Sequence, residues 1–178
     1  PPRSTLFPYT TLFRSLLSTP TSVFEGTILA NVIDGEQQLA KRPAGISDGY
    51  KLTQTTVPLA GTLALGQYDR YGLSNAYNTN VTFGNVAPVS GNLGLTSALP
   101  SDRTNTAWFD APTLNSFGLG GFNINTGNKI SINAPLQFAP GAQVRLTAPT
   151  VDIAADIIAR SGSVTVDRKS TRLNSSHL

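Results

Sequence analysis

Two carboxylates and a guanidinium are the side chains best suited to chemistry in this sequence. Asp102 and Asp110 flank Arg103, and paired carboxylates act as acid and base or nucleophile on glycosidic bonds. A β-helical polysaccharide lyase or hydrolase would use them in this way. However, residues 99–106, LPSDRTNT, are typical of a polar loop. We therefore interpret the three side chains as loop residues, and we predict no catalytic residue and no enzyme.

Metal and cofactor chemistry has few candidate residues. Asp152 and Asp156 carry the oxygen ligands that Ca²⁺ prefers, but the Gly-Gly-x-Gly-x-Asp text of calcium-binding β-rolls is absent. The chain has no Cys, and its one histidine is His177, so thiolate and imidazole ligands for zinc are missing from its body. The glycine-rich run 118–121 lacks the Lys-Ser/Thr that closes a phosphate-binding loop. We predict no metal site and no cofactor.

Aromatic side chains gather in two places. Tyr68, Tyr71 and Tyr77 lie close together in the sequence, and Trp108 and Phe109 follow about thirty residues later. Exposed aromatic side chains can form a platform for a carbohydrate or a receptor. Packing of the same rings against the flank of a β-structure is the other interpretation.

Both ends of the chain differ from its body. Residues 11–15, TLFRS, can be encoded by ACGCTCTTCCGATCT, and the reverse complement of that string, read one base in, encodes Asp-Arg-Lys-Ser, which is the sequence of residues 167–170. A natural gene has no reason to begin and end on reverse complements, whereas a ligated sequencing library has. We therefore expect residues 1–15 and 167–178 to be translated sequencing adapter, and residues 16–166 to be an internal fragment of a longer protein.

Removing the two ends changes the charge. The whole chain has 13 basic and 10 acidic residues, a net charge of +3, and a basic chain can indicate a nucleic-acid partner. The ends hold five of the basic residues and one of the acidic ones, so residues 16–166 have eight basic and nine acidic residues, a net charge of −1. We predict no nucleic-acid partner. Because every apolar run is short, we also predict no membrane-spanning segment.

Residues 16–115 have an irregular pattern. Short β-prone pieces at 27–29, 61–65 and 80–83 are separated by Asn, Gly, Pro and Asp. One short helix is plausible at 36–41, between Gly35 and Pro43. We expect a β-rich segment that is either outside the regular fold or a decorated part of it.

Residues 116–166 are more regular, because apolar-polar-apolar triplets recur from Phe122 onward. Each triplet places its outer two side chains on one face of a short strand. The triplets are FNI (122–124), ISI (130–132), LQF (136–138), VRL (144–146), VDI (151–153) and VTV (164–166), with a less regular DII at 156–158.

The spacing of these triplets predicts how the strands stack. Every third triplet matches at a step of 20 to 22 residues, so one winding of about 21 residues comprises three short strands and three corners. The sequence therefore predicts an all-β fold, a three-sided parallel β-helix. The matched positions are Phe122 with Val144 and Val164, Ile130 with Val151, and Leu136 with Ile157.

Faces and corners follow from that architecture. The middle residues of the triplets should face water, and 127–128, 140–141 and 161–162 should form corners with positive φ or tight reversals. A break at Val166 leaves the last winding open, so we expect the isolated fragment to be aggregation-prone or partly unfolded.

The stretches 142–166, AQVRLTAPTVDIAADIIARSGSVTV, and 116–124, SFGLGGFNI, resemble the body of filamentous haemagglutinin-like exoproteins. The resemblance implies a right-handed β-helix that is exported by two-partner secretion through an outer-membrane pore of a Gram-negative bacterium. It further implies that the protein is released or displayed at the cell surface as an adhesin, with glycans or proteins of host or neighbouring cells as partners. The secretion signals of the family are not recognisable, so the route is an analogy.

Two other function classes stay open. A carbohydrate-active β-helix enzyme would need carboxylates that converge from adjacent windings, whereas the predicted outward positions are Asn, Ser, Gln, Arg, Asp and Thr in mixed order. That order favours a non-catalytic scaffold. An autotransporter passenger would share the β-helix and differ in carrying its own membrane barrel.

Overall fold

The computed structural model describes residues 14–32, 60–66, 77–89, 91, 93–94 and 96–168. Strands dominate this part of the chain and all pair in parallel, which confirms the all-β prediction. The elements are β1 (Arg14–Leu17), β2 (Ser22–Val23), β3 (Thr62–Gly66), β4 (Asn80–Gly84), η2 (Ser101–Arg103), β5 (Thr106–Asp110), α2 (Ala111–Asn115), β6 (Gly121–Asn125), β7 (Lys129–Ile132), β8 (Leu136–Gln137), β9 (Gln143–Ala148), β10 (Thr150–Ile153), β11 (Ile157–Ile158) and β12 (Ser163–Arg168).

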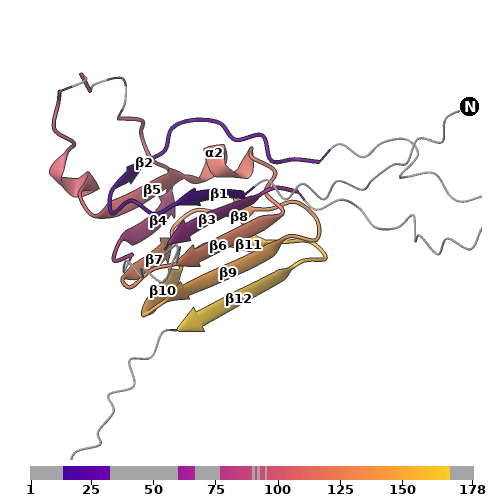
Figure 1. Ribbon diagram of the computed structural model, residues 1–178. Coiled ribbons are helices and arrows are strands. Elements are labelled where there is room, and N and C mark those ends of the chain that lie inside the picture. The colour runs from indigo at the N-terminus through magenta and orange to yellow at the C-terminus, as the bar shows by residue number, and fades with distance from the viewer. Residues whose placement is uncertain are drawn as a thin grey trace, which may run out of the picture.

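Three parallel sheets are present (Figure 1). The first has the order β1-β3-β6-β9-β12, the second β10-β7-β4-β5-β2, and the third β11-β8. From β6 onward the chain visits the first, second and third sheet in turn, twice, and ends on β12 in the first sheet. The predicted partners are confirmed: Phe122 with Val144, Val144 with Val164, Ile130 with Val151, and Leu136 with Ile157.

Alternation along the strands separates a core from an outer surface. Phe122, Ile124, Ile130 and Ile132 are fully buried, because every second side chain of a strand points to the same face. The middle residues of the regular triplets point outward and are exposed or partly exposed, as predicted: Asn123, Ser131, Gln137, Arg145, Asp152 and Thr165.

A row of phenylalanines connects the strands inside the core. The ring of Phe83 lies 5.4 Å from the ring of Phe109 and 5.4 Å from that of Phe122. Phe122 continues to Phe138 at 5.3 Å, and Phe109 continues to Phe24 at 6.3 Å. These are normal distances for aromatic pairs. One aromatic stack therefore connects Phe24, the residue that follows β2, with the regular windings.

The corners use glycine for two reasons. Gly141 has a φ of 79°, as the corner prediction requires. At the next corner, the residue with positive φ is Ser161, at 54°. Gly162 is needed there for a different reason, because the backbone of the neighbouring winding leaves no room for a side chain. A Cβ on Gly162 would lie 2.2 Å from the carbonyl oxygen of Ala142, one winding earlier.

Several strands before residue 116 belong to the same sheets as the regular windings. β3 pairs with β6, and β4 pairs with β7, so the β-prone pieces at 61–65 and 80–83 are strands. The prediction for 27–29 is wrong: these residues are not in a strand, and Leu29 is 82% exposed. The helix expected at 36–41 lies outside the described residues.

One strand lies out of sequence order. β5 sits between β2 and β4 in the second sheet, so the chain steps back one position after β4. Parallel neighbours need a crossover between them, and residues 85–105, including η2, provide it. The one-turn helix α2, which the sequence analysis missed, follows β5 and packs against β8.

Both sequence ends contribute to strands where they are described. Arg14 and Ser15 pair with Thr62 and Leu63, and β12 extends past Val166 through Arg168. The origin of these ends as adapter sequence stays a prediction. The last described winding carries exposed apolar side chains: Ile153, Ile158, Val164 and Val166.

Candidate functional site

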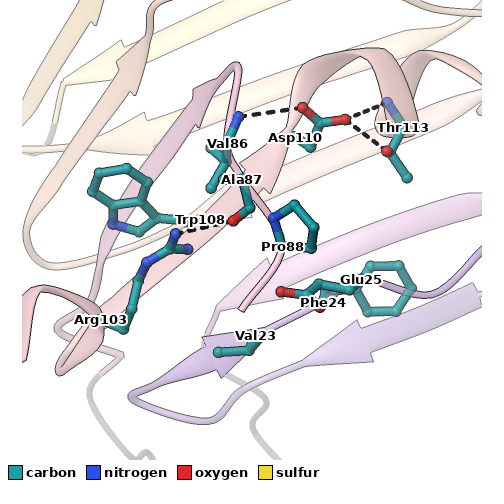
Figure 2. Close-up of a pocket in the computed structure, with 10 residues that line it drawn as sticks. All are labelled: Val23, Phe24, Glu25, Val86, Ala87, Pro88, Arg103, Trp108, Asp110 and Thr113. Atoms are coloured by element: carbon teal, nitrogen blue, oxygen red, sulfur yellow. Dashed lines mark hydrogen bonds between the residues drawn. The ribbon is translucent and has the colours of Figure 1, made fainter. Parts of the chain in front are cut away.

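The crossover between β4 and β5 builds a pocket on the outer side of the second sheet. Its volume is about 260 Å³, and it brings together Arg103, Trp108 and Asp110, which the sequence analysis had singled out (Figure 2). Four parts of the chain supply the wall: the end of β2, the start of the crossover, η2, and β5 with α2. The lining residues are Val23, Phe24, Glu25, Val86, Ala87, Pro88, Arg103, Trp108, Asp110 and Thr113.

Asp110 is the N-cap of α2. Its Oδ2 accepts hydrogen bonds from the Thr113 backbone N–H at 3.0 Å and from the Thr113 hydroxyl at 2.6 Å. Its Oδ1 accepts from the backbone N–H of Val86 at 3.3 Å. Three hydrogen bonds lower the pKa of the Asp110 carboxyl, because each of them favours the charged form. The bond from the Thr113 hydroxyl has the largest effect, and the two backbone N–H groups add to it; desolvation acts in the opposite direction and is outweighed. The carboxylate therefore ties the crossover to the helix start.

Arg103 and Trp108 form a stacked pair. The guanidinium carbon lies 4.6 Å from the centroid of the Trp108 ring, which is within cation–π distance. Nη2 of Arg103 donates to the carbonyl oxygen of Ala87 at 3.4 Å, and Nε lies 3.7 Å from Oδ2 of Asp102. The Arg103 side chain is only 11% exposed, so this charged group is mostly shielded from water.

Two donors in this wall have no hydrogen-bond partner among the described residues. They are Nε of Arg103 and Nε1 of Trp108, and both are buried. Buried donors are normally paired, so these two nitrogens are exceptions among the described residues, and their burial keeps them from direct contact with a ligand in the pocket.

The opposite wall is anionic and aromatic. Glu25 and Phe24 lie across the pocket from the Arg103 guanidinium (Figure 2), and one carboxylate oxygen of Glu25 accepts from the backbone N–H of Val89 at 2.5 Å. A small ligand with hydroxyl groups and an apolar face would meet a donor on one side and acceptors on the other. Asp110, at the side of the pocket, already accepts three hydrogen bonds from Val86 and Thr113.

The other carboxylates from the sequence analysis do not converge. Asp102 has a side chain that is 64% exposed and does not line the pocket. Asp152 forms an ion pair with Lys129 at 2.5 Å on the outer face of the second sheet, and Asp156 is an exposed corner residue. Within the described ranges no three His, Cys, Asp or Glu side chains are grouped so that they could hold a metal ion.

The aromatic residues divide between surface and core. Tyr77 and Phe109 are buried, which supports packing rather than a platform for these two, and burial raises the pKa of Tyr77. Trp108 lines the pocket beside the crossover. Tyr68 and Tyr71 lie outside the described residues.

A second hollow, of about 240 Å³, lies on the outer face of the first sheet. Ala64 forms part of its floor, because its small side chain stands in register between Leu16 and Asn123. Arg14 and Arg145 also line this hollow, and Arg145 lies 3.7 Å from Asp167. The sequence analysis missed this hollow, since the pairing of β1 with β3 spans 48 residues and has no repeat to indicate it.

No protein-family model, curated protein or solved structure matches the chain. Over the residues that the structure describes, no helix is long and apolar enough to cross a membrane.

Proposed function

We propose that the chain is a non-catalytic, adhesive segment of a secreted parallel β-helix, of the kind found in filamentous haemagglutinin-like exoproteins. The observation that carries the proposal is the stacking of strands in three parallel sheets, with partners in the regular part 20 to 22 residues apart. Each winding of such a scaffold contacts only its neighbours, so it can be long and present a repeated outer face. The right-handed sense and the secretion route rest on the resemblance.

The pocket beside the crossover is the proposed contact point on this scaffold. It stands where the second sheet departs from sequence order, and its wall holds the stacked Arg103 and Trp108. Arginine and tryptophan at the centre of a contact surface contribute more to binding than most residues. The partner would be a glycan or protein on a host or neighbouring cell, and the export partner an outer-membrane pore.

The state of Asp110 supports a non-catalytic role. A general acid in a glycosidase needs a raised pKa, whereas hydrogen bonds lower the pKa of this carboxyl. Asp102 is exposed and does not line the pocket with Asp110, which also supports a non-catalytic role. The enzymatic alternative has no comparable support.

Adhesion of coated beads tests the proposal. Beads that carry the 178-residue chain are expected to bind cultured epithelial or bacterial cells more strongly than bare beads, and Arg103→Ala should reduce binding about tenfold or more. Arg160→Ala removes the same charge from an exposed corner away from the pocket and should leave binding unchanged. Circular dichroism checks that both variants keep their strands.

Three results would count against the proposal. Beads that bind no cell type better than bare beads would remove the adhesive role, and equal loss in the two arginine variants would remove the pocket from it. Release of new reducing ends from polysaccharides by the wild-type chain would overturn the non-catalytic assignment.

A further inference from the structure

We infer that the hollow on the outer face of the first sheet is a second binding site, and that its ligand is a sugar residue carrying a carboxylate, such as a uronate within an acidic polysaccharide. The site lies on a different sheet from the pocket beside the crossover, and the two share no lining residue. The inference does not depend on the adhesive role of that pocket, so either can fail alone.

Small side chains form the bottom of the hollow. Ala64 in β3 and Thr147 in β9 point outward, because the preceding or following residues, Leu65 and Leu146, point into the core. Even so, Ala64 is only 4% exposed and Thr147 only 8%, so both lie below the side chains around them. The volume of about 240 Å³ is less than the roughly 300 Å³ at which pockets for drug-sized ligands begin. The hollow therefore has room for one ring or one small group.

The rim of the hollow is basic. Arg145 in β9 and Arg14 in β1 line it, with β3 and β6 between their strands (Figure 1). No carboxylate is among the described residues that line it, so the rim favours an anion. A guanidinium presents its N–H groups in a planar fork that matches the two oxygens of a carboxylate. The charge and the shape of the rim therefore suit a carboxylate ligand.

The Arg145 guanidinium is accessible to such a ligand. Its side chain is 61% exposed, and Nη2 lies 3.7 Å from Oδ2 of Asp167, which is too long for a hydrogen bond. Ion pairs between exposed side chains contribute little, so a ligand can displace Asp167 at small cost. Arg14 and Asp167 both belong to the ends that the sequence predicts to be adapter, whereas Arg145 does not. The inference therefore depends on Arg145 and not on Arg14.

A neighbouring amide favours a sugar over a bare anion. Asn123 in β6 is in register with Arg145 and exposed, and adjacent strands lie about 4.8 Å apart. A side-chain amide carries both donors and an acceptor, which suits sugar hydroxyls, since these also donate and accept, whereas a bare carboxylate only accepts. Oδ1 of Asn125 is buried and is not counted among the contacts. Asn123 can thus bind a ring hydroxyl while Arg145 binds the carboxylate of the same ring.

Titration calorimetry with the 178-residue chain tests the class of ligand. Oligomers of galacturonate and of alginate are the acidic probes, and methyl-esterified oligogalacturonate is the matched control, because it keeps the ring and loses the charge. We expect a Kd of about 1 mM or lower for at least one acidic probe, and binding of the ester that is at least about tenfold weaker. Lack of binding to both acidic probes, or equal affinity for the ester or for dextran sulfate, would overturn the inference.

Variants of Arg145 test the position of the site with the same titration. Arg145→Ala should weaken binding of the acidic probe about tenfold or more, and Arg145→Lys should weaken it nearly as much, because lysine keeps the charge and loses the fork. Arg160→Ala removes the same charge from an exposed corner and should leave the affinity unchanged. Circular dichroism checks that each variant keeps its strands.

Asp167→Asn provides a change in the opposite direction. Removing the competing carboxylate should strengthen binding by up to about fivefold, the range of an exposed ion pair, whereas a residue that only maintained the fold would not produce a gain. Full affinity in Arg145→Lys would reduce the site to a non-specific positive charge, and equal losses in Arg145→Ala and Arg160→Ala would place binding elsewhere. Either result, or weaker binding by Asp167→Asn, would overturn the inference.

Discussion

Asp110 shows how one side chain can look catalytic in the sequence and be structural in the fold. Its spacing from Asp102 suggested a carboxylate pair, yet its oxygens bind Thr113 and the backbone of Val86. The text Asp-Ala-Pro-Thr at 110–113 contained the relevant signal, because an Asp followed closely by Pro marks a helix start. The association of Arg103 with Trp108 had no such signal, since it depends on the path of the crossover.

Removing the Asp110 carboxylate should destabilise the protein in a pH-dependent manner. We expect Asp110→Ala to lower the free energy of unfolding at pH 7 by about 1 kcal/mol, the usual loss for an N-cap. Because the pKa of Asp110 is lowered in the folded state, its stabilising effect is present above the unfolded pKa and is lost as the pH falls through the folded pKa. Urea denaturation of both proteins at neutral and at acid pH measures the difference.

Asp102→Ala is the matched control for this change. The Asp102 side chain is 64% exposed, so its loss should alter stability by less than about 0.5 kcal/mol. A difference between Asp110→Ala and wild type that grows toward acid pH would contradict the assigned role.

The strands after residue 121 could be placed from the sequence because their spacing repeats. Phe122, Val144 and Val164 stand in register in the first sheet, at the step that the triplets predicted. The earlier strands could not be placed in this way. Leu63 and Phe122 are partners across 59 residues, and β5 reverses the sequence order, so neither pairing leaves a periodic pattern.

Paired cysteines can test whether β4 belongs to the stack. Thr82 and Ser131 are partners in adjacent strands, and Ser131 is in turn the partner of Asp152. Adjacent strands lie about 4.8 Å apart, so Thr82→Cys with Ser131→Cys should form an intramolecular disulfide. Thr82→Cys with Asp152→Cys places the thiols two strands apart, about 10 Å, and should not. Mass spectrometry after oxidation distinguishes the two outcomes, and equal cross-linking would refute the register.

The aromatic row connects the irregular and the regular parts of the described fold through direct ring contacts. Phe83 is fully buried and contacts Phe109 on one side and Phe122 on the other. These residues belong to β4, β5 and β6, so the stack bridges the crossover. The sequence predicted the buried residues of the triplets from Phe122 to Leu146, whereas the corresponding residues Ile153, Val164 and Val166 are exposed. It did not predict that phenylalanines from residues 24, 83 and 109 would extend the same core.

Truncating the centre of this row should be costly. We expect Phe83→Ala to lower the free energy of unfolding by about 3 to 5 kcal/mol, since it removes a large buried side chain and leaves a cavity. Leu29→Ala is the control, because Leu29 is 82% exposed, and its effect should stay below about 0.5 kcal/mol. Chemical denaturation followed by Trp108 fluorescence measures both. A Phe83→Ala loss as small as that of the control would show that the row does not hold the two parts together.

The constant step between partners in the first sheet has a consequence for how the chain acquires its fold. Once β6 is in place, β9 needs only about 22 more residues to reach it, and β12 about 20 more. The loop entropy of each addition is therefore the same however many windings precede it, whereas in most β-proteins the sequence separation of contacts slows folding. A polypeptide with this pattern can fold progressively from one end as it emerges through a narrow opening, and each added winding would hinder its backward sliding.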